Sequence, residues 1–526
     1  MAITGLGFTC PYQVPLRNPL FHNFIRKVCP RSVTSAIEAL EGPKHITKDS
    51  FSDSCDSVHE RGDSGNEKVR KWKKLSSKEL GITNSMISKP ARKVLNNLKQ
   101  KGYEVYLVGG CVRDLVLKRT PKDFDIITTA ELKEVRRAFS WCEIVGKRFP
   151  ICHVHLDETI IEVSSFSTSR DRVGEDSSHE SPFGCDGKDY ARWKNCLQRD
   201  FTINGLMFDP YASIVYDYLG GVEDIRKSKV RTVIPASTSL QQDCARILRG
   251  IRIAARLGFR ISRETAHSVK NLSSSVLRLD KQRLLMEVNY MLAYGSAEAS
   301  LRLLWKFGLL ELLLPIQAAY FVRSGFRRRD TRSNMLLSLF SNMDKLLAPD
   351  KPCHSSLWVS ILAFHKALSD QPRNPMVVAA FSLLIHNGGN ITEALEIVRR
   401  ITTPHDASFP ELLEPVNLNS RALTSEVMDL AKGVKAALNE MTDEHAISHA
   451  MAGYSKAPFS DLVLIPLGLY LRVCRIFECV KGGGEQGFVS KQGSKIHYES
   501  LALGSLPEVR HNFARIVFDT VFPIKS

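Results

Sequence analysis

The sequence lacks any long hydrophobic run: no apolar stretch among its 526 residues reaches the roughly 18 residues that a membrane-spanning helix needs. It also lacks paired metal-ligand cysteines, since its 12 cysteines include no Cys-x-x-Cys pair and no Cys/His group with the spacing of a zinc site. We therefore expect no membrane partner, no structural zinc and no disulfide framework. The cysteines are predicted to be free and mostly buried.

Acidic residues are missing from the first 37 positions, which carry Arg17, Arg26, Lys27 and Arg31. No continuous apolar region follows the start, so a secretory signal is not expected. A basic leader without acids is typical of organellar transit peptides, and the uncharged opening favours chloroplast over mitochondrion. A disordered N-terminus without a targeting role is the alternative. Residues 38–86 are predicted to be a disordered linker, because much of this stretch is polar, rich in Ser and Asp, and aperiodic.

Negative charge is scarce in the chain as a whole. The 72 Lys and Arg residues against 56 Asp and Glu residues give a formal net charge of +16. Such an excess favours a polyanionic partner such as RNA, although charge alone indicates attraction and not a particular fold. Nothing in the sequence identifies a protein partner or an oligomeric state.

The most informative stretch is residues 106–125, Y-L-V-G-G-C-V-R-D-L-V-L-K-R-T-P-K-D-F-D. Residues 103–108 have the length and mainly apolar composition of a buried strand, Gly109 and Gly110 interrupt this run, and residues 111–117 have helical spacing. A strand, a glycine turn and a helix together let a backbone approach phosphate oxygens, with free N–H groups and the positive end of the helix directed at them.

Asp123 and Asp125 follow, and residues 124–128 are predicted to form a second strand. Because residues i and i+2 of a strand face the same side, the two carboxylates repel each other unless a cation lies between them. A lone Gly-Gly is usually a turn, and Asp-x-Asp alone is common on solvated loops. In this order, with Arg113 and Asp114 between them, the two motifs favour a phosphate-binding turn beside a Mg²⁺ site, as nucleotidyl transfer requires.

This L-V-G-G-x-V-R-D segment followed by D-x-D resembles the head of the class II nucleotidyltransferases, the family of bacterial-type poly(A) polymerases and tRNA CCA-adding enzymes. The similarity runs from about residue 87 to about residue 340, and the chain looks like a plant organellar polynucleotide adenylyltransferase. The resemblance implies an α/β head of the polymerase-β type at residues 87–236. An all-α neck that selects nucleotides and binds RNA would follow at residues 237–300, and a helical body and tail at residues 301–526.

The resemblance extends to Q-R-D-F-T-I-N-G at residues 198–205, which is similar to the R-R-D-F-T-I-N-A block of the family. It implies that Arg199 contacts the incoming nucleotide and that Asp200 completes a catalytic set with Asp123 and Asp125. The alternative is that Arg199 and Asp200 form an ion pair that closes the domain.

Two further features lie between these motifs. Glu162 stands within a predicted strand at residues 159–165, between apolar neighbours that face the core, so it is a second candidate for a site carboxylate. Residues 167–193 are polar and aperiodic and are predicted to form a long loop over the site. The acidic-basic-proline pattern that CCA-adding members tend to carry there is missing from this loop.

Residues 241–259 are predicted to form one helix. Four arginines fall on one face of it: Arg246, Arg249, Arg252 and Arg256. Asp243, three residues before Arg246, is expected to pair with it and to hold its planar fork at a fixed angle. A solvated basic helix face is the alternative.

This helix resembles the E-D-x-x-R helix of the family, in which the Asp and the Arg act as a protein template for the incoming base. The resemblance gives that role to Asp243 and Arg246, with Arg249 as a supporting nucleotide contact. Gln242 stands where the family has Glu, and Gln198 stands where it has Arg. The Gln242 departure bears on how the Asp–Arg pair is held and on the choice of nucleotide. Together with Gln198 and the missing loop pattern, it favours poly(A) polymerase over CCA addition.

Together the motifs predict template-independent transfer of AMP from ATP to RNA 3′ ends, the reaction of a poly(A) polymerase in RNA processing. The resemblance implies a two-metal mechanism in which Asp123 and Asp125 bind two Mg²⁺ ions, while Gly109, Gly110 and Arg113 cradle the triphosphate. CCA addition to tRNA, with CTP as a further substrate, shares these motifs and stays open. A non-catalytic RNA-binding relative is the second alternative.

Overall fold

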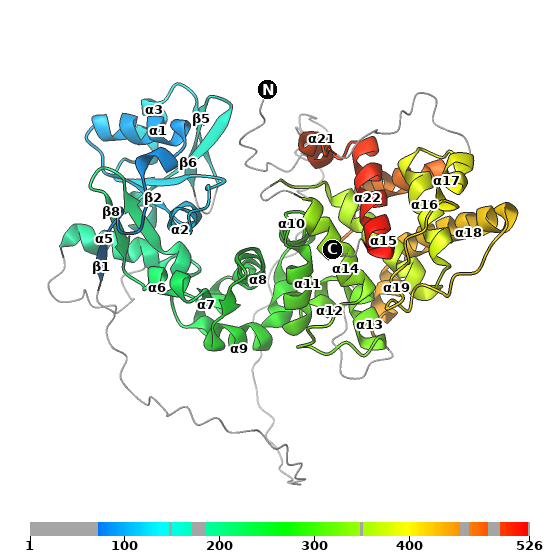
Figure 1. Ribbon diagram of the computed structural model, residues 1–526. Helices are drawn as coiled ribbons and strands as arrows, with labels where there is room; N and C mark the ends of the chain where they lie inside the picture. Colours follow the sequence, from blue (N-terminus) through cyan, green and yellow to red (C-terminus); the bar gives the residue numbers. More distant parts are fainter. Residues whose placement is uncertain are drawn as a thin grey trace, which may run out of the picture.

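The computed structural model describes residues 72–146, 150–170, 186–347, 351–452, 462–481 and 495–523. The predicted transit peptide at residues 1–37 and most of the predicted linker lie outside this part of the chain. Figure 1 shows an α/β unit at one end, joined by the green neck helices to a large group of helices at the other end. The predicted class, an α/β head followed by a helical remainder, is confirmed.

The head is built on an eight-stranded sheet in the order β1-β8-β7-β2-β3-β6-β5-β4. Neighbouring strands are antiparallel except β3 and β6, which run parallel. The strands are β1 (Lys73–Ser76), β2 (Val105–Val108), β3 (Asp125–Thr128), β4 (Cys142–Val145), β5 (Ile151–Leu156), β6 (Thr159–Ser165), β7 (Leu206–Asp209) and β8 (Ile214–Asp217). A small parallel pair, β9 (Lys229–Val230) with β10 (Arg260–Ile261), ties the head to the neck.

The first strand corrects the predicted linker, which extended to residue 86. β1 pairs with β8 in antiparallel register, with Lys74 opposite Tyr216, and a short 3-10 helix at Asn84–Met86 follows. The K-K-L-S sequence of β1 has too little apolar content to indicate a strand, and it forms one because β8 offers its free edge for backbone pairing. The head therefore begins by residue 73.

Helices cover both faces of this sheet. On one face α1 (Lys89–Gln100) and α3 (Leu132–Ala138) pack against the strands. Ser88 caps α1, and its hydroxyl accepts a hydrogen bond from the Ala91 N–H at 3.3 Å. The opposite face carries the aromatic side chains of β2 and β8, covered by α5.

α5 (Gly187–Leu197) also corrects the predicted loop at residues 167–193, whose last part is helical. The Asp186 side chain begins this helix by accepting a hydrogen bond from the Lys188 N–H. On its buried side the guanidinium of Arg192 lies 4.5 Å from the centre of the Tyr216 ring. The sequence did not indicate this helix, because its buried face includes the ion pair of Arg192 and Asp189 as well as apolar residues. A polar buried face gives no helical pattern of apolar residues.

The neck corrects the prediction of one helix over residues 241–259. α7 (Ala236–Gln242) ends at Asp243, whose backbone is extended with φ −146° and ψ 98°, and α8 (Ala245–Leu257) begins two residues later. The Asp243 carboxylate accepts a hydrogen bond from the Ala245 N–H at 3.0 Å. Short acidic side chains compete for backbone N–H groups in this way, and here the competition separates two helices.

The other helices of the head are α2 (Gly110–Val116), α4 (Ser167–Arg170) and α6 (Gly221–Arg226). The neck continues with α9 (Arg263–Asn271) and α10 (Lys281–Leu292). The body and tail contain α11 (Ala297–Lys306), α12 (Leu310–Leu313), α13 (Pro315–Arg323), α14 (Met335–Leu346), α15 (Ser355–Asp370), α16 (Pro375–His386), α17 (Ile391–Val398), α18 (Ser420–Glu440), α19 (Glu444–His449), α20 (Leu467–Phe477), α21 (Tyr498–Leu503) and α22 (Leu506–Val521).

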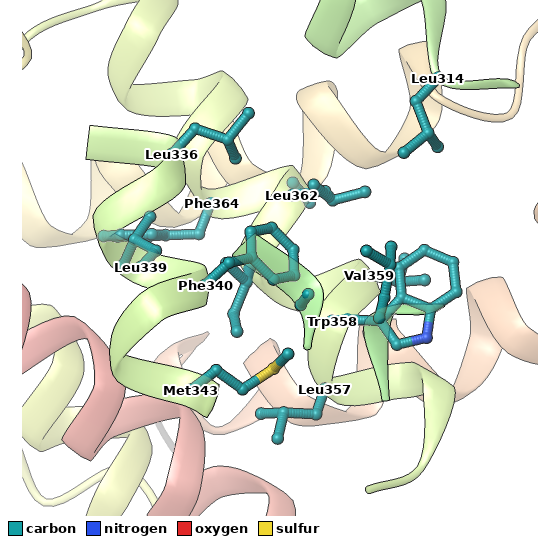
Figure 2. Packing of buried hydrophobic residues seen from close by; sticks show 14 of the residues in the cluster. Leu314, Leu336, Leu339, Phe340, Met343, Leu357, Trp358, Val359, Leu362 and Phe364 are labelled. Atoms are coloured by element: carbon teal, nitrogen blue, oxygen red, sulfur yellow. The ribbon is translucent and has the colours of Figure 1, made fainter. Parts of the chain in front are cut away.

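One continuous apolar core joins the neck, body and tail. Figure 2 shows part of this core, in which Phe340 and Met343 of α14 lie beside Leu357 of α15. The Trp358 indole N–H donates a hydrogen bond to the Asn289 side chain of the neck at 3.0 Å. The body therefore anchors the neck helices whose other side meets the head.

Within the described ranges, no helix is both long enough and apolar enough to cross a membrane. The cysteines in the same part of the chain are free thiols, and most of them are buried, as predicted.

Candidate functional site

Two of the predicted carboxylates, Asp125 and Glu162, belong to one row of side chains across the head sheet. Strand pairing sets Val108 opposite Asp125, Asp125 opposite Glu162, and Glu162 opposite His153. Directly paired residues project from the same face and stand about 5 Å apart. Asp125 therefore lies between the end of the strand that leads into the glycine turn and Glu162. The sequence made Glu162 only a second candidate, because strand register cannot be read from local pattern.

Burial raises the pKa of Asp125, Glu162 and the nearby Asp123, and acidic neighbours add to this effect at Asp125 and Glu162. Burial raises the pKa of Asp125 to about 6, the charges of Glu162 and Asp123 add to the effect, and Arg199 opposes it. Burial and the charge of Asp123 likewise raise the pKa of Glu162. Surrounding protein atoms also raise the pKa of Asp123, although its side chain reaches solvent. Acidic groups held together against repulsion are the electrostatic pattern of a cation site.

The donor set suits a Mg²⁺ ion that is shared with a substrate. Among the residues that the structure describes, no three His, Cys, Asp or Glu side chains converge into a complete metal-binding group. Mg²⁺ is commonly held by one or two carboxylates together with substrate phosphates and water, and not by an all-protein cage. The Asp123 and Asp125 carboxylates therefore fit the metal that the sequence predicts.

The glycine turn lies against these carboxylates. Gly109 has a φ of 78°, which favours glycine. A Cβ at this position would lie 3.2 Å from a carboxylate oxygen of Asp125 and 3.4 Å from a guanidinium nitrogen of Arg199. The predicted turn, aspartate and arginine are thus brought together in one place. A larger residue at position 109 would crowd the Asp125 carboxylate and contact the Arg199 guanidinium.

α2 begins at this turn, as predicted, and carries Arg113. The Arg113 guanidinium donates hydrogen bonds to Asn204 at 2.7 Å and to Asp114 at 2.9 Å. A Cβ on Gly110 would lie 3.5 Å from the same guanidinium. Two acceptors therefore fix Arg113 beside the backbone of the turn.

Three consecutive residues connect the head to the neck. The main-chain carbonyl of Gln198 accepts a hydrogen bond from Arg246 at 3.3 Å. Arg199 lies at the glycine turn, and the Asp200 carboxylate lies 2.7 Å from the Arg249 guanidinium. The predicted nucleotide contacts of the head and of the neck are thus joined through this short segment.

Asp200 is only 5% exposed, and both of its oxygens are engaged within the protein. One oxygen accepts hydrogen bonds from the Phe201 N–H at 2.8 Å and from the Asn204 amide at 3.0 Å, and the other meets Arg249. Burial acts to raise the pKa of Asp200, but Arg249 and these hydrogen bonds outweigh burial and lower the pKa. The ion pair that Asp200 forms is thus with Arg249 of the neck and not with Arg199, the partner in the predicted alternative.

The next arginines of α8 are also held by residues of the protein. The Arg252 guanidinium lies 3.2 Å from the carboxylate of Glu287, which is 1% exposed, and Arg283 pairs with the same carboxylate at 2.8 Å. Burial lowers the pKa of Arg256, and the charge of Asp114 in the head opposes this effect. The alternative of a solvated basic face is therefore wrong for this helix. Its arginines form a junction between the head and the neck.

Asp243 and Arg246 meet where α7 gives way to α8. The Arg246 Nε lies 4.0 Å from the Asp243 carboxylate, which is beyond hydrogen-bond distance. Arg246 donates instead to the Ser239 hydroxyl at 2.8 Å and to the Gln198 carbonyl. The predicted ion pair of the two side chains is therefore present at 4.0 Å, but without a hydrogen bond between them. Ser239 gave no sequence signal, because its contact with Arg246 depends on the break between the two helices.

Two family descriptions match parts of the chain. Residues 105–231 match the poly A polymerase head domain. Residues 258–321 match the family described as the probable RNA and SrmB-binding site of polymerase A. The first segment contains the glycine turn, the carboxylate row and residues 198–200. The resemblance found in the motifs is therefore confirmed by two matches, one over the head and one over the neck and the start of the body.

Curated relatives include poly(A) polymerases and CCA-adding enzymes. The chain is 30% identical to poly(A) polymerase I of Haemophilus influenzae over 289 residues, which cover 54% of this chain and 63% of the relative. It is 35% identical to poly(A) polymerase I of Escherichia coli O6:H1 over 249 residues, 46% of this chain and 54% of the relative. The CCA-adding enzyme of Staphylococcus aureus is 32% identical over 212 residues, 40% of this chain and 51% of the relative. The chain thus spans between half and two thirds of the length of these relatives.

Among solved structures, the Bacillus stearothermophilus CCA-adding enzyme in complex with CTP is similar with a TM-score of 0.42 and 21% identity. The likeness covers 76% of this chain and 95% of that chain.

Proposed function

We propose that this chain transfers AMP from ATP to the 3′ ends of RNA without a template, as a poly(A) polymerase does. The observation that carries the proposal is the register of Asp125 with Glu162 beside the turn at Gly109, inside a segment that matches the poly A polymerase head. The net charge of +16 suits an RNA partner, since basic proteins gain affinity for RNA by releasing its counterions.

Asp123 and Asp125 would hold two Mg²⁺ ions in this proposal. When bound, such ions lower the pKa of the attacking 3′-hydroxyl and stabilise the charge of the leaving pyrophosphate. Glu162 supports them, because its charge beside Asp125 favours a bound cation. Asp200 acts as a positioning residue, since it fixes Arg249 and with it the neck helix. Asp123→Ala should therefore remove metal binding and turnover together.

The glycine turn and two arginines would receive the triphosphate. Gly109 and Gly110 have no side chains, so their backbone can approach phosphate oxygens closely. Arg199 lies at this turn and offers a planar set of N–H donors that suits phosphate. Arg113 is already oriented by Asn204 and Asp114, so binding does not have to order it.

Asp243 and Arg246 would choose the base. A carboxylate accepts hydrogen bonds, and a guanidinium only donates them. Adenine and cytosine each present an amino group beside a ring nitrogen that accepts, whereas guanine and uracil present a carbonyl beside an N–H. A neighbouring acceptor and donor therefore select adenine and cytosine together.

This selection rule keeps CCA addition to tRNA as the second candidate function. The pair of Asp243 and Arg246 accepts cytosine as well as adenine, and CCA-adding enzymes are among the relatives. The head residues that receive the triphosphate would serve both reactions. Only the RNA that is extended and the point where extension stops separate the two.

Primer extension tests the proposal. The full chain is given Mg²⁺ and labelled ATP, CTP, GTP or UTP, singly and together, with an unstructured RNA or with a tRNA that ends before its CCA. Long A-only tails on the unstructured RNA are the expected result. Extension that stops after C-C-A on the tRNA would establish the second candidate. RNA binding without incorporation on either primer would identify a non-catalytic RNA-binding protein.

We also propose that residues 1–37 direct the chain to an organelle, with the chloroplast favoured. The support is the composition of this segment, which carries Arg17, Arg26, Lys27 and Arg31 and no acidic residue. Residues 1–71 fused to a fluorescent protein should enter plastids in plant cells, and mitochondria are the second expected site. A diffuse signal, equal to that of residues 72–526 fused to the same protein, would overturn this assignment.

A further inference from the structure

Two acceptors that the sequence did not indicate, on Ser239 and Gln198, hold the guanidinium of Arg246. Its Nη1 donates to the Ser239 hydroxyl at 2.8 Å, and its Nη2 donates to the main-chain carbonyl of Gln198 at 3.3 Å. Ser239 lies on α7 and is completely buried. The Arg246 side chain is only 14% exposed. Two fixed acceptors from two different segments therefore define the plane of the guanidinium.

Asp243 does not supply this orientation. One of its oxygens accepts from the Ala245 N–H at 3.0 Å, and the other remains 4.0 Å from the Arg246 Nε. Its side chain is 48% exposed. The Asp243 carboxylate is therefore available as an acceptor beside a guanidinium that other groups hold in place.

We propose that Ser239 is a specificity-determining positioning residue, which acts by fixing the angle of Arg246 against the incoming base. The inference rests on the proposed function and deepens it. Ser239 itself does not touch the substrate. Hydrogen bonds to a base are lost within a few tenths of an ångström or a few tens of degrees, so the plane of the Arg246 donors decides which ring edge they match.

The same geometry accounts for two departures of this sequence from the family pattern. Gln198 meets Arg246 through its main-chain carbonyl, which any residue at that position would supply. Gln242 precedes a helix break at which the Asp243 carboxylate accepts a hydrogen bond from Ala245, the first residue of α8. With Ser239 and the Gln198 carbonyl holding Arg246, the arginine does not depend on residue 242 for its orientation.

The test compares Ser239→Ala with Ser237→Ala, which removes an exposed hydroxyl from the same helix. Steady-state kcat/KM is measured for ATP, CTP, GTP and UTP with the full chain and an unstructured RNA primer. Ser239→Ala should lower the preference for ATP over UTP by about tenfold, the value of one hydrogen bond to a charged group. Ser237→Ala should leave this preference unchanged. A purely structural role of Ser239 would lower all four values by the same factor.

A double-mutant cycle with Arg246→Ala identifies the route of the effect. If Ser239 acts through Arg246, Ser239→Ala should not change the ATP to UTP preference further once Arg246 is replaced. Ser239→Thr retains the hydroxyl and should restore the preference. An unchanged preference in Ser239→Ala, in a protein whose wild type incorporates AMP, would overturn this inference alone. A wild type that incorporates no nucleotide would overturn the proposed function itself.

Discussion

The pair of Asp200 and Arg249 predicts an asymmetric loss of stability when either partner is replaced. Arg249→Met leaves the buried Asp200 carboxylate with only the Phe201 N–H and the Asn204 amide as partners. We expect this variant to lose about 3–5 kcal/mol in free energy of unfolding. Asp200→Asn leaves an Arg249 side chain that is 38% exposed and can be solvated. Its loss should be smaller, about 1–2 kcal/mol.

The double variant measures the interaction between Asp200 and Arg249 apart from their contacts with other groups. Because Asp200→Asn with Arg249→Met removes both charges, its loss should be smaller than the sum of the single losses by about 1–3 kcal/mol. Lys93→Met and Asp157→Asn provide a matched control, since that ion pair is more than half exposed on both sides. Each control variant should change the stability by less than about 1 kcal/mol. Calorimetric unfolding of the full chain gives all of these values.

The same two variants also predict a change in activity, because Asp200 is proposed to position the neck and not to bind metal. Asp200→Asn and Arg249→Met should lower AMP incorporation to a similar extent, measured well below the unfolding temperature of each variant. The reasoning would be refuted if Asp200→Asn kept wild-type stability and abolished incorporation while Arg249→Met stayed active. That result would put the Asp200 carboxylate at the reacting atoms.

Two further predictions concern the turn and the body. Gly109→Ala should abolish most AMP incorporation, because its Cβ would crowd Asp125 and contact Arg199. Gly102→Ala is the control: with a φ of 89° and open space around its Cβ, it should cost only the backbone strain of about 1–2 kcal/mol in stability. Equal activity losses in the two variants would contradict this prediction. Burial and the charge of Arg472 lower the pKa of His354 to about 4, and its ring accepts the Ser356 N–H at the start of α15. In the unfolded chain the imidazole binds a proton below its ordinary pKa of 6.5, whereas in the folded protein it does not until about pH 4. The free energy of unfolding should therefore fall by about 2–3 kcal/mol as the pH drops from 6.5 to about 4. His354→Asn keeps a hydrogen-bond acceptor at the start of α15 but does not titrate. In urea unfolding, this variant should lose less stability between pH 7 and pH 4.5 than the wild type. Equal losses in the two proteins would contradict the prediction.

Local sequence was enough to predict what depends on local chemistry. The turn at Gly109 and the helix after it follow from residues within one turn of the chain. The strand at residues 159–165 follows from its apolar neighbours around Glu162. The spacing of Asp123 and Asp125 predicted one shared strand face, but β3 begins at Asp125 and Asp123 lies before it.

What depends on long-range pairing could not be predicted. β1 is a strand only because β8 lies beside it, and Glu162 becomes the neighbour of Asp125 only through the parallel register of β3 and β6. The break at Asp243 is settled by one backbone hydrogen bond to its carboxylate, which competes closely with helix continuation. Arg249, which pairs with Asp200, and the Gln198 carbonyl, which accepts from Arg246, are far from their partners in the sequence, so no spacing indicates these two contacts.

The measurement that tests the central claim most directly is the rate of AMP incorporation by Asp125→Asn. This change removes one negative charge from the carboxylate row and keeps the size of the side chain. Asp157→Asn makes the same chemical change in an exposed turn between β5 and β6 and serves as the control. Loss of metal-assisted charge stabilisation worth several kcal/mol predicts a fall on the order of a thousandfold for Asp125→Asn, with Asp157→Asn at the wild-type rate. An Asp125→Asn variant that stays within tenfold of the wild type would contradict the assignment of this row as the site of nucleotidyl transfer.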